Sequence, residues 1–490
     1  MTLRDLLHGV TATPVAAVPI SGIARDSKRV RPGDLFVAIR GNVEDGHAYI
    51  NEAIARGAAA VVAEHLPPRP PRSCPCVVVP DARAALAVAA SRFYGHPARK
   101  LRVVAVTGTN GKTTTTYLLR AILDAHGARA GMLGTVAYQI GERVVPSTNT
   151  TPGPLELQRY FAQMVGEGLQ WCVMEASSHA LAQGRLDGVV LDAAVFCNLG
   201  SDHLDYHKTR EAYAAAKRRL FEYLDQDGAA VINVDDVFGR TLAQTIPHRR
   251  VVTVGLEPPA AVTAHNISCG WQGSRMMVDS PWGRFELATP LLGRHNIPNV
   301  LGAAAALLAL GVPSETVARG IQGAAGVPGR LERVPTETGV HVFVDYAHTA
   351  DALRLVLQSL RELADGRLIV VFGCGGDRDR SKRSVMGRVA GQLADEVILT
   401  SDNPRSEDPM RIIDEIRAGV PADYHHSQVM TDREQAILAA LQAAHPGDTV
   451  LIAGKGHEAH QEFDHVMVPF SDRAVIEHWA ATRHNLAVSA

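Results

Sequence analysis

The first hundred residues alternate short apolar runs with amphipathic stretches, which is typical of strands and helices that cover one another. The apolar runs that predict strands are residues 35–39, 58–63 and 76–79. Between the last two lies a proline-rich stretch, residues 66–75, which predicts a surface loop because proline cannot donate to a strand ladder. We expect a small α/β domain over residues 1–98.

From about residue 101 the pattern changes to longer apolar runs, each followed by a helical stretch. Runs that are apolar at every position are typical of parallel strands, because helices cover both faces of such a sheet. The runs that predict these strands are residues 103–106, 172–174, 193–197 and 229–234. The positions then alternate and include aromatic residues over 251–291, which predicts an antiparallel insertion or edge.

A third group of apolar runs follows Gly329, with polar or glycine-containing segments at the run ends. The runs are residues 341–345, 368–373, 396–400 and 449–454. We therefore expect an α/β protein of three domains, in keeping with 490 residues at roughly 150 per domain. These are a small N-terminal α/β domain (1–98), a central P-loop-type doubly wound parallel sheet (99–328) and a C-terminal Rossmann-like α/β domain (329–490).

The composition narrows the classes of function. Apolar residues make up 46% of the chain and charged residues 20%, which excludes a largely disordered protein. The formal net charge of −2 gives no general basic field, so we expect neither nucleic acid nor membrane as a partner. The longest weakly polar run, residues 299–312, is too short to span a bilayer and predicts a buried helix. An N-terminus without an apolar signal core and six scattered cysteines predict a reduced, cytoplasmic protein.

The strongest motif is a turn between a predicted strand and a predicted helix, V-A-V-T-G-T-N-G-K-T-T-T-T (104–116). Its glycines let backbone N–H groups point at phosphate oxygens, and the helix N-terminus adds its dipole. Lys112 supplies a positive charge, and Thr113 supplies a hydroxyl for Mg²⁺. The full P-loop pattern is missing, because Val106 stands five positions before Gly111. The alternative is an ordinary glycine-containing turn with an exposed lysine.

We expect the ligand of this loop to be a nucleoside triphosphate. The chain has no N-K-x-D motif, which argues against a GTPase.

Two further polar segments follow predicted strands of the central domain. M-E-A-S-S-H-A (174–180) places Glu175 at a strand end, where a doubly wound sheet offers a second Mg²⁺ ligand. N-L-G-S-D-H-L-D-Y-H (198–207) offers His203 as a metal ligand, and Lys217 lies in the helix that follows. For each residue the alternative is structural: a loop acid, a structural histidine and a solvated helical lysine.

Four polar loops of the C-terminal domain also follow predicted strands, where α/β sheets bind ligands. They are Y-A-H-T-A-D-A-L (346–353), G-C-G-G-D-R-D-R (373–380), S-D-N-P-R-S-E-D-P (401–409) and G-K-G-H-E (454–458). The second loop anchors Arg378. Pro404 fixes the turn of the third, which presents Asp402, Asn403 and Arg405. One such loop alone is most often polar surface, whereas four at one edge predict a binding face.

Together these motifs resemble the Mur ligase family over nearly the whole chain. The resemblance runs from D-S-K-R-V-R-P-G-D-L-F-V-A-I-R-G (26–41) through T-G-T-N-G-K-T-T to D-N-P-R and G-K-G-H-E. In this family D-N-P-R marks members that take diaminopimelate. The resemblance implies an N-terminal domain for a uridine nucleotide, a central ATPase domain and a C-terminal domain for the incoming amino acid. Two local departures are D-S-K in place of the usual D-S-R, and A-H-Q after G-K-G-H-E.

The resemblance implies an ATP-dependent, amide-forming ligase of peptidoglycan precursor synthesis. It would add meso-2,6-diaminopimelate to the D-glutamate carboxylate of UDP-MurNAc-L-Ala-D-Glu, with Mg²⁺ as cofactor and ATP as co-substrate. ATP would phosphorylate the carboxylate, and the amine would attack the acyl phosphate. Because two anions must be brought together in line, cations at the phosphate and positioning supply most of the catalysis. We expect a monomer.

The resemblance also implies which residues form the site. ATP is expected at Gly108, Thr109, Asn110, Gly111, Lys112, Thr113, Thr114, Asn299, Arg330 and Asp345. The catalytic residues are expected to be Lys112, Glu175, His203 and Lys217, and the Mg²⁺ ligands Thr113, Glu175, His203 and Lys217 as a carbamate. The UDP-sugar peptide is expected at Ser27, Asn42, Val43, Glu44, Asn149, Thr150, Thr151, Ser177, Gln183 and Arg185. Diaminopimelate is expected at Arg378, Asp402, Asn403, Pro404, Arg405, Gly454 and Glu458.

Two alternative functions are open at this point. A folylpolyglutamate synthase shares the type of phosphate loop and the acyl-phosphate chemistry, but the separate N-terminal domain and D-N-P-R argue against it. A nucleotide-dependent switch protein would bind nucleotide without amino-acid-dependent turnover. Such a switch does not need anchors spread over three regions of the chain.

Overall fold

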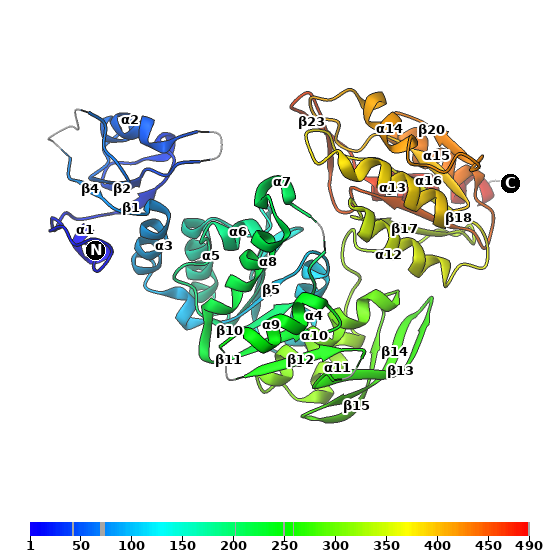
Figure 1. Ribbon diagram of the computed structural model, residues 1–490, viewed down its shortest axis with the longest axis horizontal. Helices are drawn as coiled ribbons and strands as arrows, with labels where there is room; N and C mark the ends of the chain where they lie inside the picture. The colour runs from blue at the N-terminus through cyan, green and yellow to red at the C-terminus, as the bar shows by residue number, and fades with distance from the viewer. Residues whose placement is uncertain (42–43, 69–73, 201, 248–249, 258, 489–490) are drawn as a thin grey trace.

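Three sheets, each built from its own stretch of chain, dominate the computed structural model (Figure 1). The structure describes residues 1–488 except 42–43, 69–73, 201, 248–249 and 258. The first sheet uses strands between residues 22 and 78, the second between 102 and 289, and the third between 332 and 453. The expected α/β class with three sheet-based units is therefore confirmed.

The N-terminal sheet is small and entirely parallel, in the order β1-β2-β3-β4. Its strands are β1 (Gly22–Ala24), β2 (Asp34–Val37), β3 (Ala60–Ala63) and β4 (Cys76–Val78). Its helices are α1 (Leu3–Leu6), α2 (Ile50–Ala55) and α3 (Ala82–Phe93), with short turns η1 (Ser27–Arg29) and η2 (Gly46–Tyr49). β2 and β3 are buried at every position, because α1 and α3 cover one face and α2 covers the other. The three predicted runs correspond to β2, β3 and β4, whereas the three residues of β1 are too few to show a period.

The central sheet has eleven strands in the described part of the chain, in the order β15-β14-β13-β12-β11-β10-β5-β9-β6-β7-β8. They are β5 (Arg102–Thr107), β6 (Ala130–Leu133), β7 (Ala137–Ile140), β8 (Arg143–Pro146), β9 (Trp171–Glu175), β10 (Leu191–Phe196), β11 (Leu224–Asn233), β12 (Val251–Gly255), β13 (Val262–Gly270), β14 (Gly273–Ser280) and β15 (Gly283–Thr289). The helices are α4 (Lys112–Ala125), α5 (Pro154–Gly166), α6 (Ser178–Ala182), α7 (Leu204–His207), α8 (Arg210–Arg218), α9 (Val237–Thr245), α10 (Ile297–Ala309) and α11 (Ser314–Gln322). Three short turns are η3 (Pro97–Lys100), η4 (Arg219–Tyr223) and η5 (Arg294–Asn296).

Helices cover both faces of the parallel part of this sheet. α4, α10 and α11 pack on one face, and α5, α6, α8 and α9 pack on the other. The predicted doubly wound sheet is therefore confirmed. α10 is buried along its length, as the apolar run there predicts. Among the helices that the structure describes, none is long and apolar enough to cross a membrane.

Antiparallel strands extend the central sheet at both edges. β13, β14 and β15 pair antiparallel, which confirms the edge predicted over residues 251–291, although β12 itself pairs in parallel. At the opposite edge β7 and β8 also pair antiparallel. The sequence does not predict this second edge, because β7 and β8 have four residues each and β8 is largely exposed, so no buried period develops.

The C-terminal sheet has the order β16-β17-β21-β18-β19-β20, parallel except at β16. Its strands are β16 (Glu332–Val334), β17 (His341–Asp345), β18 (Leu368–Phe372), β19 (Glu396–Leu399), β20 (Ser427–Val429) and β21 (Thr449–Ala453), and a hairpin of β22 (His460–Phe463) and β23 (Val466–Pro469) follows. α12 (Ala350–Arg361), α13 (Ser381–Leu393) and α14 (Pro409–Arg417) cover one face, and α15 (Arg433–Ala443) and α16 (Asp472–Val488) cover the other. The four predicted runs are β17, β18, β19 and β21, whose carboxyl ends meet at one edge.

Candidate functional site

The turn between β5 and α4 has the backbone that a phosphate-binding loop requires. Gly111 has a φ of +86° at the N-cap of α4. A Cβ on it would lie 2.2 Å from Oδ1 of Asn299, so no side chain fits between this loop and α10. On the other side, the Asn110 N–H donates to Oδ1 of Asn198 (2.9 Å), which follows β10. Glycine at the N-cap and this hydrogen bond fix the loop at the N-terminus of α4, and a helix N-terminus favours an anion.

Lys112 begins α4 and folds back over the loop. Its Nζ donates to the carbonyl oxygens of Gly108 (2.8 Å) and Thr109 (2.9 Å). Burial lowers the pKa of Lys112, and the nearby Glu175 carboxylate opposes that shift. An ordinary turn with an exposed lysine is therefore wrong for this segment, because Lys112 is only partly exposed and its ammonium group is hydrogen-bonded to the loop.

Glu175, the last residue of β9, is only 1% exposed and lies behind Thr113. Its Oε2 accepts from Thr113 Oγ1 (3.1 Å), and the Thr135 N–H (2.8 Å) and hydroxyl (2.9 Å) donate to the same carboxylate. Adjacent hydroxyl and carboxylate oxygens are the ligands that Mg²⁺ prefers. Thr113 and Glu175 thus fit a magnesium ion. No motif marks Thr135, which only the tertiary fold brings to the carboxylate.

The helix α8 adds two buried side chains to the same region. The Tyr213 hydroxyl lies 3.0 Å from Thr109 Oγ1, and one turn further on Lys217 is 1% exposed. Nζ of Lys217 lies 4.4 Å from the centre of the Tyr213 ring. Burial lowers the pKa of Lys217 well below its usual value, and Lys112 adds to that shift. The solvated helical lysine is therefore wrong, since Lys217 is enclosed.

His203 lies in the same segment but nearer to solvent. Its backbone is left-handed, with a φ of +55°, and its Nε2 lies 3.5 Å from Asp202 Oδ2. Burial lowers the pKa of His203, and the Asp202 carboxylate opposes the shift. The charges of Lys112 and Lys217 lower it further. A lowered pKa favours the neutral imidazole, which is the form that binds a metal ion.

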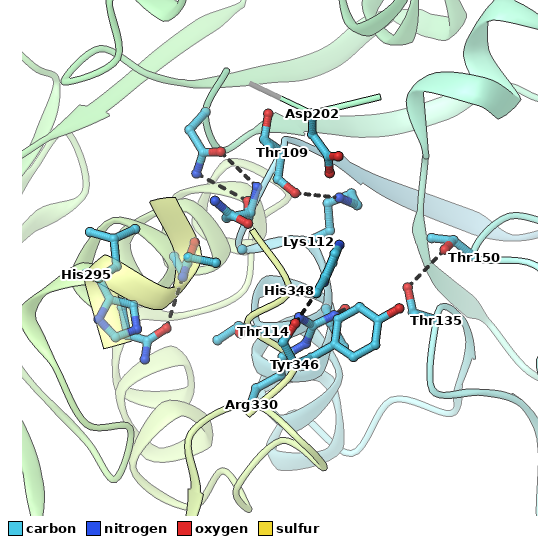
Figure 2. A pocket seen from close by; sticks show the side chains of 18 of the residues that line it. Thr109, Lys112, Thr114, Thr135, Thr150, Asp202, His295, Arg330, Tyr346 and His348 are labelled. Carbon is cyan, nitrogen blue, oxygen red and sulfur yellow. Dashed lines mark hydrogen bonds between the residues drawn. The ribbon is translucent and has the colours of Figure 1, made fainter. Parts of the chain in front are cut away.

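These groups surround a cavity of about 280 Å³ between the central and C-terminal sheets (Figure 2). The predicted nucleotide and metal residues that line it are Thr109, Asn110, Gly111, Lys112, Thr113, Thr114, His203, Lys217, Asn299, Arg330 and Asp345. Gly108 and Glu175 do not line it, because they support Lys112 and Thr113 from behind. Residues from three parts of the chain therefore converge on one cavity.

The C-terminal side of this cavity is built around Arg330. Its Nη2 donates to Thr113 Oγ1 (3.3 Å), and its guanidinium lies 4.6 Å from the centre of the Tyr346 ring. Asp345 ends β17 and is buried, and its Oδ2 accepts from the Leu331 N–H. Burial raises the pKa of Asp345 to about 6, against the attraction of Arg330. Figure 2 shows Arg330 and Tyr346 next to one another, below Lys112 in this view.

A second cavity, of about 560 Å³, lies between the N-terminal unit and the central sheet. The predicted uridine-nucleotide residues that line it are Ser27, Glu44, Asn149, Gln183 and Arg185. Ser27 Oγ donates to Glu52 Oε2 (3.0 Å), and Arg185 Nε donates to Gln183 Oε1 (3.0 Å). Asn42 and Val43, predicted for the same substrate, lie outside the described residues.

The other predicted substrate residues connect the two cavities. Thr150 and Ser177 line the first cavity rather than the second. Thr151 faces neither, because it is fully buried. Its hydroxyl donates to the Glu175 carbonyl (2.9 Å) and accepts from the Ser177 N–H (3.0 Å). Thr151 thus links the segment after β9 to the loop that carries Thr150.

At the C-terminal edge a buried lysine joins two of the predicted loops. Lys455 Nζ, fully buried, donates to Asn403 Oδ1 (2.9 Å) and Glu458 Oε2 (3.0 Å). Asn403 Nδ2 also donates to Glu458 Oε2 (2.8 Å). Burial raises the pKa of Glu458, but Lys455 and these hydrogen bonds outweigh it and lower the pKa. The motif G-K-G-H-E contains Lys455, yet only the structure shows that it holds both loops.

The remaining predicted residues lie on the same edge. Asp402 is buried, and burial raises its pKa. Gly454 has a φ of +113°, and a Cβ there would lie 2.5 Å from Asp402 Oδ2, which leaves no room for a side chain. Pro404 precedes Arg405, whose Nη1 donates to the Gly376 carbonyl (2.6 Å). Arg378 is exposed and contacts only its own loop among the described residues.

Tyr346 connects the first cavity to this edge of the C-terminal sheet. Burial raises the pKa of Tyr346 to about 12, and the carboxylates of Glu458, Asp402 and Asp202 contribute in that order. Its ring centre lies 5.4 Å from that of His457, in the loop after β21. The two sites therefore meet at Tyr346 rather than lying on separate faces.

The fold and the site together define the class of enzyme. A phosphate-binding loop of the central unit faces a second α/β unit, which presents polar loops of its own. Family models match the chain in three blocks: residues 19–94 match "Mur ligase family, catalytic domain", 106–307 "Mur ligase middle domain" and 329–456 "Mur ligase, glutamate ligase domain". The chain belongs to the Mur ligase family and is an ATP-dependent, amide-forming ligase.

Similar proteins cover the whole chain. A protein of Geobacter metallireducens named UDP-N-acetylmuramoyl-L-alanyl-D-glutamate--2,6-diaminopimelate ligase is 45% identical over 497 residues, with 96% of this chain and 97% of its own covered. The protein of the same name from Geobacillus kaustophilus is 45% identical over 486 residues, with 97% and 98% covered. A solved structure described by that name has a TM-score of 0.72 at 34% identity, and 99% of each chain is covered.

Proposed function

We propose that this protein joins meso-2,6-diaminopimelate to the D-glutamate carboxylate of UDP-MurNAc-L-Ala-D-Glu and converts ATP to ADP and phosphate. One arrangement carries the proposal: Tyr346 lies between the phosphate-loop cavity and the loops that hold D-N-P-R and G-K-G-H-E. Full-length similarity to relatives named for this reaction supports it. The enzyme acts in peptidoglycan precursor synthesis, in the cytoplasm where ATP and uridine nucleotides are available.

The nucleotide occupies the cavity between the central and C-terminal sheets. Its phosphates lie on residues 108–114, where loop N–H groups and the α4 N-terminus favour anions. Lys112 neutralises the transferring phosphoryl group, for which its enclosed ammonium is the nearest fixed charge of the loop. Asn299, Arg330 and Asp345 contact the nucleotide from α10 and from the C-terminal side.

Two Mg²⁺ sites serve the phosphates. Thr113 and Glu175 hold one ion, because their oxygens already lie together. His203 and Lys217 serve the other, with Lys217 as a carbamate, since a buried ammonium would repel a cation and a carbamate oxygen would bind it. When bound, Mg²⁺ supplies positive charge that screens the phosphates from the approaching carboxylate.

The reaction proceeds in two steps. An oxygen of the D-glutamate carboxylate attacks the γ-phosphorus of ATP, and the bond to the β-phosphate oxygen breaks to release ADP. The amine of diaminopimelate then attacks the acyl carbon, and the tetrahedral intermediate loses phosphate and a proton to give the amide. The protein holds the reactants in line, and positioning contributes most of the rate in such transfers.

The other two substrates occupy separate regions. The uridine nucleotide lies in the second cavity, at Ser27, Glu44, Asn149, Gln183 and Arg185, with Thr150 and Ser177 guiding the peptide toward the phosphates. Asn42, Val43 and Thr151 complete the substrate set that the family resemblance implies. Diaminopimelate binds the C-terminal edge through Arg378, Asp402, Asn403, Pro404, Arg405, Gly454 and Glu458.

The domains divide this work. We place their boundaries after residues 98 and 328, the first within η3 and the second between α11 and β16. Residues 1–98 hold the uridine nucleotide, 99–328 hold ATP, and 329–490 select the amino acid. The active unit is a monomer.

The direct experiment is product analysis. The purified protein is incubated with UDP-MurNAc-L-Ala-D-Glu, ATP, Mg²⁺ and meso-diaminopimelate, and the nucleotide product is identified by mass spectrometry. A product larger by one diaminopimelate residue, formed only when all components are present, is expected. Turnover with a folate and glutamate would instead indicate a folylpolyglutamate synthase, and nucleotide binding without any product would indicate a switch protein.

A further inference from the structure

The hairpin after G-K-G-H-E lies directly against the D-N-P-R turn. The Arg405 N–H donates to the Glu462 carbonyl (3.0 Å), and the Asp464 N–H donates to the Arg405 carbonyl (2.8 Å). The Glu462 N–H donates to Asn403 Oδ1 (3.1 Å). Gln461 adds a side-chain hydrogen bond to the Asp402 carbonyl (2.8 Å). β22 therefore fixes the course of the turn from one side.

The Arg405 side chain is held at two of its three nitrogen atoms. Nε donates to Glu462 Oε2 (2.9 Å), and Nη1 donates to the Gly376 carbonyl (2.6 Å). In the part of the chain that the structure describes, Nη2 has no hydrogen-bond partner. Arg405 has a φ of +54°, and its side chain is 19% exposed. Nη2 thus stays available while Nε and Nη1 are anchored.

We propose that Glu462 is a positioning residue for amino-acid selection: it anchors the base of the Arg405 guanidinium so that the Nη end faces a carboxylate on the incoming amino acid. This inference rests on the proposed function, in which Arg405 receives the distal carboxylate of meso-diaminopimelate. A guanidinium binds a carboxylate well only when its planar fork is presented in the right plane. An unanchored arginine side chain would have to lose its rotamer freedom at each binding event.

Selection against L-lysine follows from the same arrangement. L-Lysine has no distal carboxylate, so it would leave Nη2 of Arg405 desolvated and without a partner. A firmly held guanidinium cannot turn to solvent to escape that penalty, whereas a loosely held one can. Glu462 therefore sharpens the preference as well as the affinity, although its own carboxylate need not touch the amino acid.

The test compares Glu462→Ala and Glu462→Gln with the wild type. We expect Glu462→Ala to lower kcat/KM for meso-diaminopimelate about tenfold through KM, the size of one charge-assisted hydrogen bond, and to reduce the preference over L-lysine. KM for ATP and for the UDP-sugar peptide stays unchanged. Glu462→Gln keeps an acceptor for Nε and restores the preference to within about threefold of wild type. Glu477→Ala, which removes the exposed pair with Arg473 on α16, is the matched control.

A double-mutant cycle separates positioning from simple support of the fold. In an Arg405→Ala background, Glu462→Ala should change the preference by less than about twofold, because the residue through which it acts is gone. Additive losses, a lower KM for diaminopimelate in Glu462→Ala, or no change in preference would each overturn the inference. If thermal melting shows that Glu462→Ala does not fold, Glu462→Met is tested in its place. Methionine fills the same space without a hydrogen-bond acceptor for Nε. Absence of diaminopimelate-dependent turnover in the wild type would instead overturn the proposed function and this inference with it.

Discussion

Lys112 and Lys217 face one cavity, yet their surroundings suit different roles. Lys112 is bonded to loop carbonyl oxygens and lies near Glu175, which supports its charged form. Lys217 packs on the Tyr213 ring, and burial together with the charge of Lys112 lowers its pKa well below the usual value. At the scale of single residues, one side chain is suited to remain a cation and the other to become a neutral, reactive amine.

Lys112→Ala should reduce turnover by at least about a hundredfold, because the transferring phosphoryl group loses its nearest fixed charge. Its Nζ spans only loop carbonyl oxygens, so its removal opens no apolar cavity and the protein should stay folded. ADP release and a thermal melt measure the two effects, with the exposed Lys100→Ala as control. Near-normal ADP release from a folded Lys112→Ala protein would contradict the nucleotide-site assignment.

Lys217 should carry a carbamate in the active enzyme. The neutral amine that its lowered pKa favours reacts with CO₂ to form a carbamate and release a proton. Removal of CO₂ and bicarbonate should therefore lower activity, and their return should restore it. Lys217→Ala should be inactive, and a short-chain carboxylic acid should restore part of the activity, with the exposed Lys208→Ala as control. An unmodified lysine in the intact mass of the active protein would refute this role.

Asp345 should make stability depend on pH. Its pKa is about 6 in the folded protein and 3.8 in the unfolded reference, so the folded state binds the proton more tightly. Stability therefore falls as pH rises from about 4 to 6, by an amount on the order of 3 kcal/mol. Asp345→Asn should be more stable than wild type above pH 6, with the gap closing toward pH 4. Urea denaturation across this range checks it, with the exposed Asp423→Asn as control; a gap that does not vary with pH would contradict it.

At the scale of elements, a buried ion pair joins β19 and β21, the strands that lead into the D-N-P-R and G-K-G-H-E loops. Arg433 begins α15 and pairs with Asp472 at the start of α16 (2.7 Å), and neither side chain is exposed. Arg433 also donates to the carbonyl oxygens of Ser401 (3.3 Å) and Ala453 (3.0 Å), just beyond β19 and at the end of β21. The pair therefore ties two helices to the two strands from which D-N-P-R and G-K-G-H-E begin.

Arg433→Met should destabilise the protein by about 3–5 kcal/mol, because Asp472 is left buried without a partner. The double change Arg433→Met with Asp472→Leu should recover part of the loss, since it removes the uncompensated charge. Chemical denaturation measures both, and Glu477→Ala, from an exposed pair, should cost less than about 1 kcal/mol. A loss equal to that of the control would show that the buried pair does not hold these elements.

A strand or a site residue can be predicted from the sequence when the pattern that marks it lies within a short stretch of chain. β17, β18, β19 and β21 each contain a run of at least three buried apolar residues and are predicted from the sequence, whereas β8 is largely exposed and is not. Glu175 and Lys112 lie in local motifs next to strands. Thr135 has no such motif, and it meets Glu175 only because β6 and β9 are neighbours in the sheet.

Lys217 and Lys455, which tertiary packing buries, show the same limit. Lys217 lies beside Arg218 and Arg219, so its sequence context resembles a solvated helix face, and only packing of α8 buries it. Lys455 lies in a recognised motif, but its bond to Asn403 depends on strands far apart in the chain. Burial of a charged side chain arises from contacts between distant segments, which no local pattern contains.

At the scale of the whole molecule, the three units meet at two cavities. The first lies between the central and C-terminal sheets, and the second lies between the N-terminal unit and the central sheet. Thr150 and Ser177 face the first cavity while Asn149 and Gln183 face the second. In the proposed function, a substrate with a uridine nucleotide at one end and a peptide carboxylate at the other would span these cavities. The proposed reaction thus uses the arrangement of the whole chain.

The most direct test of this account is the rate of ADP release by the wild-type protein with UDP-MurNAc-L-Ala-D-Glu and either meso-diaminopimelate or L-lysine. We expect release that requires both the nucleotide substrate and the amino acid, with kcat/KM for diaminopimelate higher by at least about tenfold, the size of one lost charge-assisted hydrogen bond. Equal rates with both amino acids, or release that needs neither, would contradict it.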